Sequence, residues 1–210
     1  MMPKKFTNKT RLVQKTDVAK IAKKTVIRMS EKKFHDHTFS LDPAAWNYSG
    51  IVVPFSNIAV GTSDSTRIGD RIRLRKLQLK MNLYVGTVNS TVRVIVFRWK
   101  LRYATDTPVP GSIIKSAFIN TVYAPIGQLD YDNKASFQVL SDRVYSMGAG
   151  SDSVHRINQT IDLKDSPVQY HAGSTTDQNF GIYAMFINDN SAAAASATVY
   201  GVSRMLYTDM

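Results

Sequence analysis

The sequence has no cysteine, only one glutamate (Glu31) and no long apolar run. Without cysteine the chain has no disulfide framework, no thiolate nucleophile and none of the thiolate ligands usual in structural zinc sites. No apolar run approaches the roughly 18 residues of a transmembrane helix, and the first fifteen residues lack the apolar centre of a secretory signal. We therefore expect a chain without membrane insertion that stays in a reducing compartment and is held together by packing or assembly.

The composition predicts one folded domain with a tail. The chain has 210 residues, 43% of them hydrophobic and 20% charged, which is typical of a globular protein. Almost all acidic residues are aspartates, and most stand in turn-like segments, where Asx turns explain them without catalysis. No nucleotide-binding, metalloprotease or hydrolase motif is present, and we predict no enzymatic activity.

The net charge of +11 is concentrated near the N-terminus. Residues 1–33 hold eleven cations against Asp17 and Glu31, a net of 11 − 2 = +9, whereas the remaining residues have a net of +2. This asymmetry predicts a basic nucleic-acid-binding arm over residues 1–33 and a nearly neutral folded body over residues 34–210. The predicted nucleic-acid-binding residues of the arm are Lys4, Lys5, Lys9, Arg11, Lys15, Lys20, Lys23, Lys24, Arg28, Lys32 and Lys33.

Within the arm, residues 16–32 have helical spacing. Val18, Ile21, Thr25 and Met29 follow one stripe, while most of the lysines lie off it. A helix of three to four turns is marginal in isolation, so we expect it to form when a polyanion neutralises its charge. An ordinary surface helix and a membrane-surface helix are the alternatives, and the thin apolar stripe without large anchors favours nucleic acid.

The segment "RIGDRIRLRKLQLKM", residues 67–81, reads as a charged strand that changes phase. Ile72 and Leu74 are even-numbered apolar residues, but from Leu77 onward the apolar residues are odd-numbered. Because side chains alternate with a period of two, the change predicts a β-bulge at Arg75-Lys76. Before it, three arginines share the face opposite the core, and we predict that Arg71, Arg73 and Arg75 contact nucleic acid or a neighbouring subunit.

About eight segments of this kind, separated by turn residues and without βαβ alternation, predict an all-β fold. The natural arrangement is an eight-stranded antiparallel jelly-roll sandwich. Residues 91–102 end in Arg98, Lys100 and Arg102, which are further candidates for the cationic surface. Residues 112–122 are the only helical candidate of the body, and residues 179–189 are apolar on both faces, as in a central strand.

Metal sites are weakly indicated. His35 and His37 share one strand face but lack an evident third ligand, so surface or interface roles are favoured. Asp130 with Asp132, or Asp209, could ligate calcium where two subunits meet, although turn chemistry explains these residues as well. We predict no cofactor and assign no metal ligand.

Several short motifs, taken in order, carry a resemblance. Gly69-Asp70 opens the basic strand, Phe97-Arg98-Trp99 ends the next, Thr107-Pro108 forms a turn, and residues 137–142 read Phe-x-Val-Leu-x-Asp. This order resembles the single jelly-roll capsid proteins of the satellite-necrosis-virus type, which also occur in circular Rep-encoding single-stranded DNA (CRESS-DNA) viruses. The resemblance implies a short helix at residues 113–118, a T=1 icosahedral shell of sixty copies, inward arms on the genome and, in some members, calcium at subunit contacts.

We therefore predict a structural coat protein of the virion that self-assembles as a homo-60-mer and packages viral nucleic acid, single-stranded DNA by the resemblance. Assembly is expected inside the host cell, with the nucleus as one location. Sixty arms would supply about 60 × 9 = 540 positive charges. The alternatives are a non-capsid single-stranded nucleic-acid-binding β-barrel protein, and a sugar-binding or cupin-like enzyme on the same fold.

Overall fold

The computed structural model describes residues 18, 20–22, 25, 31–42, 46–85, 88–100, 107–149, 154–190 and 197–210. The chain divides into two units, Met1–Glu31 and Lys32–Met210. In the first unit residues 18, 20–22 and 25 are helical and exposed, in agreement with the predicted helix. At the end of the predicted helix Glu31 has no regular structure and Lys32 begins the first strand, and its other residues lie outside the described ones. The second unit begins at Lys32, whereas the sequence placed the start of the body at residue 34.

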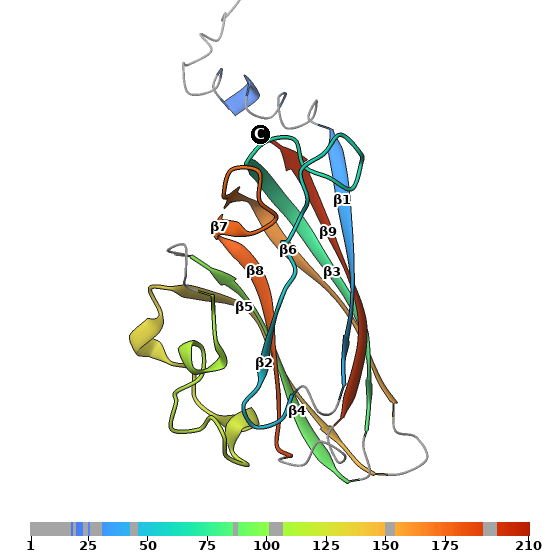
Figure 1. Ribbon diagram of the computed structural model, residues 1–210, viewed down its shortest axis with the longest axis vertical. Coiled ribbons are helices and arrows are strands. Elements are labelled where there is room, and N and C mark those ends of the chain that lie inside the picture. Colours follow the sequence, from blue (N-terminus) through green and yellow to red (C-terminus); the bar gives the residue numbers. More distant parts are fainter. Residues whose placement is uncertain are drawn as a thin grey trace, which may run out of the picture. The chain divides into compact units, whose positions relative to one another are not determined.

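The second unit is a sandwich of two antiparallel sheets (Figure 1). One sheet has the strand order β1-β9-β3-β6-β7 and the other β2-β8-β4-β5. Without the short β7, the two orders are β1-β9-β3-β6 and β2-β8-β4-β5, which is the eight-stranded arrangement of a jelly roll. Strand β7 is added at the edge beside β6. The bounds are β1 Lys32–Leu41, β2 Ile51–Pro54, β3 Arg71–Tyr84, β4 Ser90–Trp99, β5 Phe137–Met147, β6 Val154–Tyr170, β7 Asp177–Asn179, β8 Gly181–Asn188 and β9 Thr198–Asp209. The predicted jelly-roll sandwich is therefore confirmed, with a ninth strand that the sequence did not predict.

Strand β3 changes phase where the sequence predicted it. Leu74 pairs with Tyr207 of β9 and Lys76 with Leu206, so Arg75 is the extra residue of a bulge. Before the bulge Ile72 and Leu74 are buried, and after it the odd-numbered residues from Leu77 onward are buried. The bulge lets one long strand keep its apolar side chains in the core on both sides of the irregularity.

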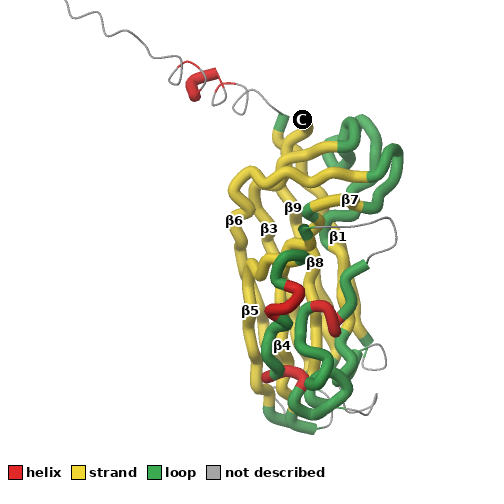
Figure 2. Tube along the Cα trace, turned by 90° about the vertical axis from the view of Figure 1, so that its left-hand side faces the viewer, coloured by secondary structure: helices red, strands yellow, loops and turns green. Residues whose placement is uncertain are grey.

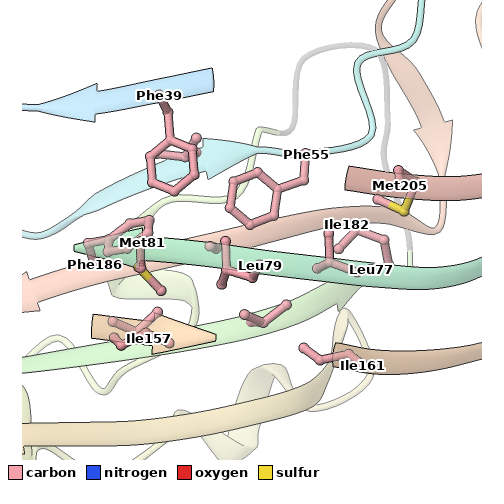
Figure 3. Packing of buried hydrophobic residues seen from close by; sticks show 14 of the residues in the cluster. Phe39, Phe55, Leu77, Leu79, Met81, Ile157, Ile161, Ile182, Phe186 and Met205 are labelled. Atoms are coloured by element: carbon pink, nitrogen blue, oxygen red, sulfur yellow. The ribbon is translucent and has the colours of Figure 1, made fainter. Parts of the chain in front are cut away.

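The main core fills the space between the two sheets (Figure 3). Leu77, Leu79 and Met81 of β3 face Ile182 and Phe186 of β8. The aromatic rings of Phe39 and Phe55 close the core near β1, with ring centroids 5.4 Å apart. Burial of these apolar side chains is the main force that holds the two sheets together.

The segment between β4 and β5 covers the outer face of the four-stranded sheet. Its residues 107–136 contain three 3₁₀ helices, η1 Pro110–Ser112, η2 Ala124–Ile126 and η3 Tyr131–Asn133, which lie on that side of the body (Figures 1 and 2). Ile113, Ile114 and Ala124 pack there against Phe97 and Met185 in a second core. Strand β8 is consequently buried on both faces, as its sequence predicted.

The predicted helix at residues 112–122, and its part at residues 113–118, is not formed. The structure has turns there, and Ile114 makes a β-bridge with Leu129. The apolar residues of this segment are spaced as in a helix, but they pack onto the sheet from turns. Tertiary packing therefore overrides the local helical preference. Among the described residues, no helix is both long and apolar enough to cross a membrane.

Candidate nucleic-acid interface

The outer face of the five-stranded sheet carries an uncovered row of polar side chains on β3. Arg71, Arg73, Lys76, Gln78 and Lys80 are exposed or half-buried there, because their apolar neighbours point into the core. At about 3.3 Å per residue the row extends for roughly 30 Å from Arg71 to Lys80. The row is therefore long and repeatedly positive, so it can contact several successive charges of an extended polyanion.

The three predicted arginines of β3 differ in their pairing. Arg71 is exposed and Arg73 half-buried, and neither has an ion pair among the described residues. Arg75 lies at the bulge, where its Nε donates to Oδ1 of Asp165 at 3.1 Å. Part of its charge is therefore neutralised within the subunit, so Arg71 and Arg73 are the better candidates for contact with an external partner.

An open groove of about 710 Å³ lies further along the same face. Lys80 and Arg156 supply its two cations, and Asn82, Asn158 and Tyr200 add amide groups and a phenol. The remaining lining residues are Thr38, Phe39, Ser40, Met81, Ile157, Gly201 and Val202. No acidic residue is among those that line the groove, so both cations are without a counter-charge in it.

Tyr200 gives this groove an aromatic wall. Its side chain is 52% exposed, and its ring meets that of Tyr84 edge-on with centroids 5.6 Å apart. A smaller hollow continues from Lys80 and Val202 towards Asp36 and Arg204. There Arg204 hydrogen-bonds the Asp36 carboxylate at 2.7 Å and lowers the pKa of that group, so this pair is internally neutral. The free positive charge therefore belongs to the groove itself.

Sequence reasoning missed Lys80 and Arg156 as site residues. Lys80 lies on the same alternating face of β3 as Arg71 after the bulge is counted, a signal that was present in the sequence. Arg156 belongs to β6, which pairs with β3 through Asn82. Its proximity depends on that pairing register, which no local pattern specifies. The two cations are thus brought together by the fold.

The arm assignment needs correction at its C-terminal end. Lys32 and Lys33 belong to β1 rather than to the arm. The Lys33 side chain is 1% exposed, its Nζ lies 3.0 Å from Asp209 Oδ2, and it also donates to the Thr66 carbonyl. Lys33 is therefore an internal ion-pair partner and not a phosphate ligand in the folded subunit. Lys32 is exposed and remains a candidate.

Of the other arm residues, Lys20 is described, and it is exposed in a helical turn. The remaining predicted arm ligands lie outside the described residues: Lys4, Lys5, Lys9, Arg11, Lys15, Lys23, Lys24 and Arg28.

At the end of β4, Arg98 is half-buried on the same row as Val94 and Val96. Lys100 donates to the Lys134 carbonyl at 3.3 Å, and Arg102 lies outside the described residues.

Among the described residues no group of three or more His, Asp or Glu side chains could hold a metal ion. Both Asp130 carboxylate oxygens accept hydrogen bonds inside their own turn, from the Asp132 amide and the Asn133 side chain. Asp209 is engaged with Lys33 and with the backbone amide of Ile68. Asp130 and Asp209 thus have partners within the subunit, and calcium at subunit contacts stays a prediction.

Jelly rolls of eight strands occur in viral capsids, lectins and cupins. A long cationic face, an acid-free groove and a basic N-terminal segment are suited to a polyanion, which favours the viral capsid class over lectins and cupins. The family model of the satellite tobacco necrosis virus coat protein matches residues 2–210, and the chain belongs to this family. Its role is therefore that of a structural protein of the virion.

Several solved virus structures are similar to the chain. Cocksfoot mottle virus shares 10% identity, with 85% of this chain and 93% of that chain covered and a TM-score of 0.41. Desmodium yellow mottle tymovirus shares 10% identity over 85% of this chain and 89% of that chain, with a TM-score of 0.40. Turnip yellow mosaic virus shares 11% identity over 85% and 94%, with a TM-score of 0.37. No curated protein matches by sequence.

Proposed function

We propose that sixty copies of this coat protein form a T=1 shell that encloses a single-stranded genome. The N-terminal arm and the outer face of the five-stranded sheet contact the packaged strand. The groove between Lys80 and Arg156 carries this proposal, because two cations stand beside amide, hydroxyl and aromatic groups without any acid. Phosphates would pair with the cations, and a base would stack on Tyr200.

Charge neutralisation supplies the affinity. Met1–Glu31 contains nine cations and two acids, a net of 9 − 2 = +7, so sixty copies would bring about 60 × 7 = 420 charges. A longer genome would require further cations, which the sheet face supplies. Binding of this kind releases counterions from the strand, so it is strongly salt-dependent and tolerant of sequence.

The resemblance to capsid proteins of CRESS-DNA viruses supports DNA as the packaged strand. The two nucleic acids are distinguished by digesting the material extracted from particles with DNase or with RNase. Loss on DNase treatment alone supports DNA. Loss on RNase treatment alone would replace DNA with RNA and leave the coat role unchanged.

The groove is tested by the double variant Lys80→Gln/Arg156→Gln. We expect a folded subunit whose affinity for a single-stranded oligonucleotide depends less on salt, with the slope of log K against log salt reduced by about 1.4 for two lost phosphate contacts. The matched control is Lys115→Gln/Lys134→Gln, which removes two exposed cations from the segment over the opposite sheet. An unchanged slope in the groove variant, or an equal reduction in both, would refute the groove assignment.

A further inference from the structure

A second cleft, of about 450 Å³, lies between β5 and β6, where the two sheets separate at one edge of the sandwich. Arg98 and Lys164 bring positive charge to its lining and Asp162 negative charge. Gln138, Gln159 and Thr160 add neutral donors from both strands. None of the residues that line this cleft also lines the groove between Lys80 and Arg156.

Arg98 is the unusual residue of this cleft. Its side chain leaves β4 on the row of Val92, Val94 and Val96, which is the row that packs into the main core. The guanidinium donates to Oγ of Ser166, while Nε is enclosed and has no hydrogen-bond partner. Arg98 makes no ion pair with any carboxylate of the described residues, and burial lowers its pKa.

Among the described residues two arginines are buried, Arg67 and Arg93, and both form ion pairs with aspartates. Arg93 binds both carboxylate oxygens of Asp142, at 2.8 and 2.7 Å, and donates to two backbone carbonyls. Arg67 pairs with Asp70, donates to several carbonyls and lies 4.0 Å above the Tyr170 ring. A half-buried guanidinium without a counter-charge is costly, so Arg98 stands out against the pattern that the same molecule sets elsewhere.

We propose that the Arg98 cleft binds a phosphate group. A tetrahedral oxyanion offers several acceptor oxygens, which suits the Arg98 guanidinium and the side-chain amides of Gln138 and Gln159 that line the same cleft. Ser166 orients the guanidinium, because its hydroxyl is itself fixed by a bond to the Leu163 carbonyl. The phosphate is either free inorganic phosphate or a phosphate of a bound nucleic-acid strand.

The first test measures binding of inorganic phosphate to the full chain by calorimetry at constant ionic strength, with chloride as the balancing ion. We expect Arg98→Gln to weaken phosphate binding at least about tenfold. In chloride alone this variant should be no less stable than the parent, because an uncompensated charge has been removed. Lys115→Gln removes an exposed cation from the segment over the four-stranded sheet, outside this cleft, and should leave phosphate binding unchanged.

A variant that strengthens phosphate binding distinguishes a specific phosphate site from a loss of binding caused by impaired folding. Asp162 Oδ1 accepts the backbone amide of Lys164 at 2.9 Å, and asparagine keeps an acceptor oxygen at that position. Asp162→Asn should therefore strengthen phosphate binding by removing the negative charge of the cleft. Unchanged phosphate binding in both Arg98→Gln and Asp162→Asn would overturn the proposal, whatever the two variants do to packaging.

A short single-stranded oligonucleotide identifies the source of the phosphate. If Arg98→Gln also weakens binding of the oligonucleotide, and inorganic phosphate competes with the oligonucleotide for the parent chain, the cleft holds a phosphate of the strand. If the variant weakens binding of inorganic phosphate alone, the cleft holds the free ion. Both results support a phosphate site, whereas absence of phosphate binding to the parent chain contradicts it.

Discussion

Arg93 shows at the scale of one residue how the segment between β4 and β5 is held on the sheet. Its guanidinium spans from Asp142 on β5 to the carbonyls of Pro125 and Gly127 in that segment. The side chain is only 10% exposed, so the ion pair is largely shielded from water. A single arginine thus connects two strands of the sheet to the layer that covers them.

We expect Asp142→Asn to lower the free energy of unfolding by about 2–3 kcal/mol, because Arg93 then keeps its charge in a mostly buried place. Chemical denaturation measures this value. Asp132→Asn is the control, since it removes an exposed carboxylate from the same segment. Equal losses of unfolding free energy in the two variants would contradict the role of Arg93 in holding the segment on the sheet.

His37 makes stability depend on pH. Burial lowers its pKa below the ordinary 6.5, and the nearby charge of His35 lowers it further. The unfolded chain therefore binds this proton more tightly than the folded chain, so stability decreases as the pH falls below about 6.5 and stops decreasing below the folded-state pKa. His37→Gln should flatten this part of a stability-against-pH curve. A curve equally steep in His37→Gln would contradict the assignment.

At the scale of elements, β3 was the most predictable part of the chain and the segment at residues 107–136 the least. Alternation alone located the bulge at Arg75, because core burial imposes a period of two on each side of it. The helix-like spacing at Ile113 and Phe118 misled, because a segment can match that spacing in turns when it packs onto a sheet. The burial of Lys33 depends on the distant Asp209, so the local charge pattern assigned it to the arm.

The bulge itself is testable by deletion. Removing Arg75 leaves Leu74 adjacent to Lys76, so Ile72, Leu74, Leu77 and Leu79 follow one continuous alternation and all face the core. We expect this deletion variant to fold, as judged by circular dichroism and thermal unfolding. Deleting Gln78 from the regular part of the strand instead turns one half of β3 away from the core and should prevent stable folding. Arg75→Ala keeps the extra residue and should cost no more than about 1 kcal/mol for the exposed ion pair with Asp165. Equal destabilisation by the two deletions would contradict this account.

At the scale of the whole molecule, one face of the sandwich is closed and the other open. The segment over β4 and β8 buries the outer face of the four-stranded sheet, whereas the five-stranded sheet presents Arg71, Lys80 and the groove. This asymmetry gives the subunit a distinct cationic side, as a coat protein that encloses a polyanion requires. The sequence indicated that β3 carries positive charge. Only the fold showed that this charge lies on the open sheet and not on the sheet that the segment covers.

The mass and nucleic-acid content of the assembled full chain test the central claim most directly. Sixty chains of 23.5 kDa predict particles with about 1.4 MDa of protein, which analytical ultracentrifugation measures together with ultraviolet absorbance for enclosed nucleic acid. A chain lacking residues 1–31 should keep the folded body and lose most of that nucleic acid. Full-length protein that remains a monomer or small oligomer, or a truncated chain that packages as much nucleic acid as the full chain, would contradict the account.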